Sequence, residues 1–145
     1  MYMKTKKIFD VKEFNNIKEI IYNSADEFGE RIAFTIKNKE EKEVHYTDIT
    51  YKKLIEDINS LGSSLYSLNL KGKRVAIIGK NRYEWILAHL SNLLGGIVSI
   101  PLDKDLQLGE LENSLIRSKA DAIVFDSKLE DLISQIHGEM VKKQY

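Results

Sequence analysis

The sequence predicts an α/β fold, and two observations carry that prediction. After residue 72, short apolar runs alternate with stretches of helical periodicity, and the runs are continuously apolar, which is typical of parallel strands buried on both faces. The 145 residues, 43% of them hydrophobic, suffice for one core. We therefore expect a Rossmann-like parallel sheet of about three strands with flanking helices, preceded by a helix and a β-hairpin.

Residues 1–48 are expected to hold the helix and the hairpin. Apolar residues between 15 and 28 fall on one helical face, and Gly29 stands where a helix end favours a left-handed residue. Residues 32–36 and 44–47 alternate apolar and polar side chains on either side of a polar run, which is typical of two paired strands.

Residues 49–145 are expected to form a helix followed by a βαβαβα unit, all within one 1–145 subdomain. Thr50 is positioned to cap the first helix, which ends near residues 69–72. The predicted strands are 75–79, 97–102 and 122–125, and the predicted helices are 82–94, 109–118 and 128–137. Asn81 with Glu84 resembles a capping box, and Ser127 is expected to cap the last helix.

Composition disfavours several classes of protein. Lys plus Arg equal Asp plus Glu at 22 each, so no global charge attracts a nucleic acid. Cysteine is absent, which suits a reducing compartment, and the N-terminus lacks the pattern of a secretory signal. The uncharged stretch 85–102 contains two adjacent glycines and a proline and is interpreted as helix, turn and strand instead of a transmembrane segment. We expect a cytoplasmic protein.

Ligands of open parallel sheets usually bind beyond the carboxyl ends of the strands, so the loop Gly79, Lys80 and Asn81 is the candidate ligand-facing segment. It matches neither of the two common glycine-rich phosphate-binding motifs, and a plain strand-to-helix turn is the favoured explanation of this segment. Asp126 ends a strand as the phosphate acceptor of a receiver domain does, but without the accompanying acidic pair it is interpreted as a turn or cap residue.

The remaining chemistry-bearing residues indicate structural roles. The histidines His45, His89 and His137 lie far apart and lack zinc-site spacing, and His89 is interpreted as a hydrogen-bonded structural residue. Trp85 is expected to anchor the core. By residue chemistry alone we expect no catalytic residue, no metal ligand and no bound cofactor in this chain.

Four motifs in order, however, carry a resemblance to a known family. They are Ile-Thr-Tyr-Lys-Lys-Leu (49–54), Lys-Gly-Lys-Arg-Val-Ala-Ile-Ile (71–78), Asn-Arg-Tyr-Glu-Trp (81–85) and Gly-Gly-Ile-Val-Ser-Ile-Pro-Leu (95–102). Together they resemble the N-terminal part of the AMP-binding, adenylate-forming enzymes, and the Asn-Arg-x-Glu-Trp form is most similar to long-chain fatty acyl-CoA ligases. The likeness spans residues 24–125. Lys73 departs from it, because the family commonly has Asp there.

The resemblance implies a parent enzyme that condenses a carboxylate with ATP to an acyl-adenylate and then transfers the acyl group to coenzyme A. ATP, magnesium and coenzyme A are implied for that parent, whose phosphate loop, Mg²⁺-binding glutamate, ribose-binding aspartate and catalytic lysine lie later in the family's sequences. Only structural roles carry over: Thr50 and Asn81 as caps, Gly95 and Gly96 as a turn, and Pro101 as a strand end.

We therefore expect an N-terminal piece of a fatty acyl-CoA ligase that is inactive alone and whose partner is the remainder of that enzyme. Self-association through an open sheet edge is expected as well. The alternative is a free-standing, non-catalytic Rossmann-like module that binds a partner or a nucleotide.

Overall fold

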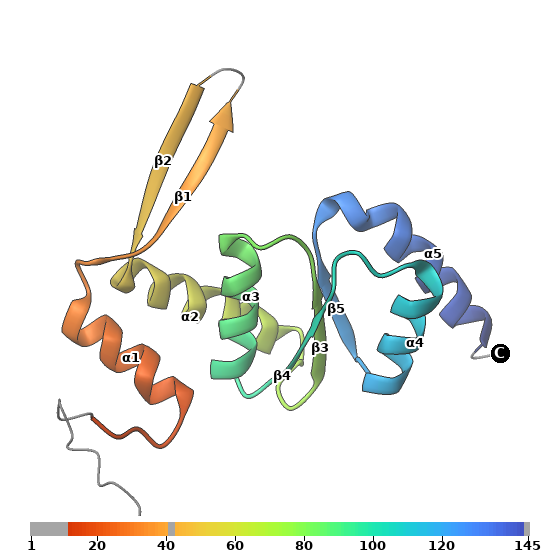
Figure 1. Ribbon diagram of the computed structural model, residues 1–145. Coiled ribbons are helices and arrows are strands. Elements are labelled where there is room, and N and C mark those ends of the chain that lie inside the picture. The colour runs from red at the N-terminus through yellow and green to blue at the C-terminus, as the bar shows by residue number, and fades with distance from the viewer. Residues whose placement is uncertain (1–11, 41–42, 144–145) are drawn as a thin grey trace, which may run out of the picture.

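A computed structural model describes residues 12–40 and 43–143 (Figure 1). The elements run in the order α1 (Ile17–Phe28), β1 (Ile32–Glu40), β2 (Glu43–Thr50), α2 (Tyr51–Ser67), β3 (Arg74–Ile78), α3 (Tyr83–Leu94), β4 (Val98–Leu102), α4 (Leu108–Ser118), β5 (Ala122–Phe125), the 3₁₀ turn η1 (Ser127–Leu129) and α5 (Glu130–Lys143). The predicted helix, hairpin and βαβαβα order is confirmed.

The second part of the chain is built on a parallel sheet in the order β4-β3-β5. Residues 75–78 of the central strand β3 are at most 1% exposed, as predicted for a strand buried on both faces. The two outer strands differ from that prediction, because each has a neighbour on one side only. Val98 of β4 is 48% exposed and Phe125 of β5 is 38% exposed.

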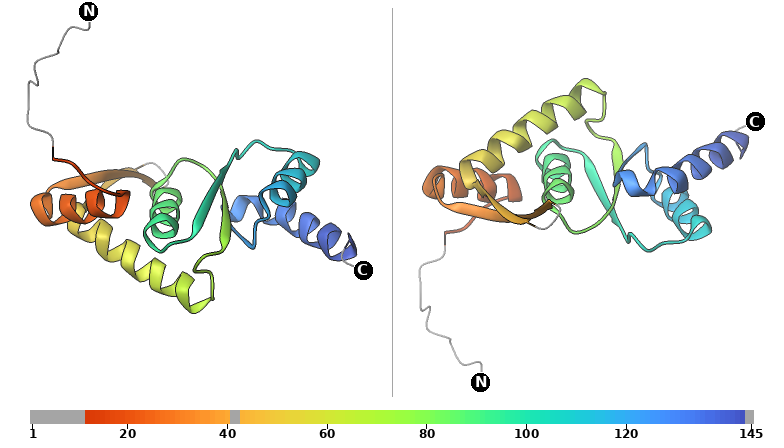
Figure 2. Two further views of the ribbon diagram at one scale, coloured as in Figure 1. Left: turned by 90° about the horizontal axis from the view of Figure 1, so that it is seen from below. Right: turned by 90° about the horizontal axis from the view of Figure 1, so that it is seen from above.

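Helices cover the two faces of the sheet (Figures 1 and 2). Ala76 and Ile78 of β3 point to one face, where they pack against Leu111 of α4 and Ile136 of α5. Val75 points to the other face and packs with Leu65 of α2. This alternation along one strand is the two-residue period of β structure, and it divides the core into two layers.

The hairpin β1–β2 projects away from the sheet (Figure 1). Its strands pair antiparallel, with an irregularity between Ile32 and Phe34. The Phe34 ring lies edge-on to the ring of Tyr83 at 5.9 Å between centroids, which fastens the base of the hairpin to α3. The stretch 85–102 forms α3, a turn at Gly95 and Gly96, and β4, as predicted. Within the described ranges no helix has the length and apolar character needed to cross a membrane.

Helix ends are where sequence and structure differ most. Thr50 caps α2 as predicted, because its side chain accepts a hydrogen bond from the Lys53 N–H. Gly29, however, is right-handed (φ −45°, ψ −44°), because its carbonyl accepts the Lys52 N–H and so ties the end of α1 to α2. The predicted left-handed cap is therefore wrong.

Two predicted N-caps are also shifted by one residue. Arg82 occupies the cap position of α3 in place of Asn81, and its Nε holds the Glu84 carboxylate at 2.7 Å, so that carboxylate is not available for a capping box with Asn81. Ser127 lies inside the 3₁₀ turn, which Asp126 caps instead. Pro101 is the fourth of five residues in β4 and not its end.

Candidate functional site

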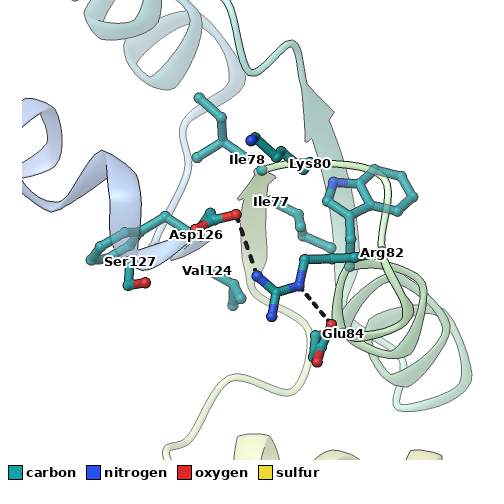
Figure 3. Close-up of a pocket in the computed structure, with 11 residues that line it drawn as sticks. Ile77, Ile78, Lys80, Arg82, Glu84, Val124, Asp126 and Ser127 are labelled. Atoms are coloured by element: carbon teal, nitrogen blue, oxygen red, sulfur yellow. Dashed lines mark hydrogen bonds and ion pairs between the residues drawn. The ribbon is translucent and has the colours of Figure 1, made fainter. Parts of the chain in front are cut away.

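The candidate site is a hollow of about 190 Å³ at the carboxyl ends of β3 and β5, beside the start of α3 (Figure 3). Ile77 of β3 and Val124 of β5 form its apolar floor, and Trp85 forms a wall. Arg82 and Asp126 carry charges at its rim. The position is the one at which open parallel sheets generally bind ligands.

An ion-pair bridge spans this hollow. Arg82 Nε donates to Glu84 Oε2 at 2.7 Å, and Arg82 Nη1 lies 3.5 Å from Asp126 Oδ2 (Figure 3). The Asp126 side chain is only 5% exposed, whereas that of Arg82 is 52% exposed. The bridge therefore joins the loop after β3 to the end of β5, two segments 44 residues apart in the sequence.

The electrostatics of the bridge keep both carboxylates ionised. The Lys128 backbone N–H, which donates to Asp126 Oδ1 at 3.1 Å, lowers the pKa of Asp126, and Arg82 acts in the same direction against the cost of burial. The hydrogen bond from Arg82 likewise lowers the pKa of Glu84. A general base needs a pKa near the working pH, so these carboxylates are suited to holding the site together and not to moving protons.

The structure splits the predicted loop Gly79, Lys80 and Asn81. Gly79 and Lys80 line the hollow, whereas Asn81 lies beside the hairpin, in a second depression next to Phe34. A Cβ on Gly79 would lie 3.2 Å from the Cβ of Asp126, so glycine permits the close approach of the end of β5 at this point. Gly79 is therefore accounted for by packing, independently of any ligand.

Lysines gather at the same edge of the sheet. Lys80, Lys104 and Lys128 follow β3, β4 and β5 respectively, and all three line a depression of about 160 Å³ adjoining the hollow. Lys104 is paired with Asp105. Asp105 and Asp126 line the same depression, so three ammonium groups stand against two carboxylates and the local excess of positive charge is small.

The buried polar residues of α3 have structural roles. His89 Nδ1 lies 2.8 Å from Ser99 Oγ on β4, which confirms the predicted hydrogen-bonded histidine. Asn92 Nδ2 donates to the same hydroxyl at 3.4 Å. Trp85 stacks on His89 with 5.4 Å between ring centroids and is only half-buried, so the prediction that it anchors the core is wrong.

The sequence identified this edge of the sheet as the candidate site, but it did not show which side chains meet there. The Arg82–Asp126 bridge and the grouping of Lys104 and Lys128 with Lys80 depend on which strands are neighbours, and the apolar runs do not specify that order. Across the part of the chain that the structure describes, no three His, Asp or Glu side chains come together as a metal would require.

Comparison with known proteins assigns the family. The model of the AMP-binding enzyme family matches residues 21–144. This chain belongs to that family. The match includes both sides of the candidate site, and it confirms the resemblance carried by the four sequence motifs.

Curated relatives in the AMP-binding family are acyl-CoA ligases by name. The mitochondrial medium-chain acyl-CoA ligase ACSF2 of Bos taurus is 30% identical over 120 residues, which are 77% of this chain and 20% of that ligase. Fatty acyl-CoA synthetase A of Dictyostelium discoideum is 29% identical over 98 residues, 67% of this chain and 15% of that protein. The chain thus spans about a fifth or less of the length of these relatives.

Solved structures of similar fold include the anthranilate CoA ligase AuaEII in complex with anthranoyl-AMP, with a TM-score of 0.75 at 18% identity over 89% of this chain and 24% of that one. The N-terminal subdomain of Klebsiella oxytoca NpsA matches with a TM-score of 0.67 at 22% identity, over 79% of this chain and 28% of that chain. At these identities the likeness establishes the fold.

Proposed function

We propose that this chain is the N-terminal sheet-bearing part of an ATP-dependent fatty acyl-CoA ligase. The observation that carries the proposal is the family match over residues 21–144, together with acyl-CoA ligases as curated relatives. The partner of the chain is then the remainder of the enzyme, and the parent reaction is formation of an acyl-adenylate from a carboxylate and ATP, followed by acyl transfer to coenzyme A.

The residues of this chain fit only part of the cofactor set. A magnesium ion needs several oxygen ligands, and the described residues bring no such group together. The lysine edge combines Lys80, Lys104 and Lys128 with two carboxylates, those of Asp105 and Asp126, and so keeps a small excess of positive charge. We propose that the metal is held by the rest of the enzyme and that phosphate groups of ATP or coenzyme A meet this chain at the lysine edge.

The chain alone is expected to be inactive. Phosphoryl and adenylyl transfer depend on a phosphate-binding loop and a metal that stabilise the developing charge, and the sequence carries neither common phosphate-binding motif. The test is pyrophosphate release by the purified chain with palmitate, MgATP and coenzyme A, beside a full-length ligase of the family as positive control. No release above a blank is expected, whereas clear turnover would contradict the proposal.

Substrate class and location are properties of the whole enzyme. We propose a long-chain fatty acid from the Asn-Arg-x-Glu-Trp form of residues 81–85, although the ACSF2 relatives are medium-chain ligases by name. A panel of fatty acids of increasing length together with aryl carboxylates tests this: highest turnover on medium chains would reject the long-chain proposal, and a preference for aryl carboxylates would reject the fatty-acid assignment. The cytoplasmic location stays a prediction that cell fractionation tests.

A further inference from the structure

We draw no further inference here: the strongest candidate, the depression of about 460 Å³ between α1, α2 and α3 that Lys18 and Lys71 flank, carries none, because each of these lysines already lies over the ring of a neighbouring tyrosine and nothing in the structure shows what covers the depression.

Discussion

Truncation of Leu111 is expected to remove a large part of the stability of the fold. This α4 side chain is fully buried (0% exposed) and packs against Ala76 and Ile78 of β3 and Ile136 of α5. In Leu111→Ala, three carbons at about 0.8 kcal/mol each remove about 2.4 kcal/mol of transfer free energy. A residual cavity of ~50 Å³ adds about 1.2 kcal/mol, for a loss of about 3.5 kcal/mol.

Urea unfolding followed by far-ultraviolet circular dichroism measures this loss. Natural domains unfold with about 5 to 15 kcal/mol, so Leu111→Ala should stay folded in water but unfold at a clearly lower urea concentration. The matched control is Ile116→Ala on the same helix, whose side chain is 48% exposed and whose loss should stay below about 1 kcal/mol.

The reasoning would be refuted if Leu111→Ala lost less than about 1.5 kcal/mol, which lies below the range for Leu→Ala in cores. It would also be refuted if the two variants unfolded at the same urea concentration. Either result would mean that α4 does not pack on the sheet as the structure has it.

Two other changes test a helix cap and an ion pair. Thr50→Ala removes the acceptor of the Lys53 N–H and should lower the free energy of unfolding by about 1 kcal/mol, measured in the same urea experiment; an unchanged midpoint would contradict the cap. Arg82→Gln removes the hydrogen bond that holds the pKa of Glu84 below its ordinary 4.5. A carboxyl group whose pKa is lower in the folded than in the unfolded protein stabilises the fold at pH values above its unfolded pKa. That stabilisation is lost as the pH falls through the folded pKa, so wild type keeps it to below about pH 4.5. Arg82→Gln lacks it and should unfold at a higher pH than wild type. Superimposable acid titrations of wild type and variant would refute this.

The helices and strands could be predicted from the sequence because each has a local cause. The 3.6-residue period of α2, the hydroxyl of Thr50 ahead of it and the apolar run of β3 act within a few residues, and a single sequence displays them directly. Cap positions were less predictable, since Asn81 and Arg82 compete for one place. The helix begins one residue later than the Asn81 signal indicates, and Arg82, the residue at the cap position, makes no side-chain capping hydrogen bond.

Prediction of the site required the strand order, which local sequence patterns do not contain. The strand order β4-β3-β5 places the end of β5 next to the end of β3, and only then do Arg82 and Asp126 meet. Trp85 was misjudged for a related reason: a large aromatic residue in an apolar helix normally indicates a core position, but here α3 leaves it at the wall of the hollow.

The placement of Trp85 gives the molecule a built-in optical reporter. It is the only tryptophan of the chain, so all indole emission comes from one wall of the hollow at the ends of β3 and β5. The ring stacks on His89, which holds the indole at this wall of the hollow. Displacement of water from the hollow would shift the emission toward the blue. Unlabelled protein in a cuvette can therefore reveal whether the hollow is filled when the rest of a ligase, or a ligand, is added.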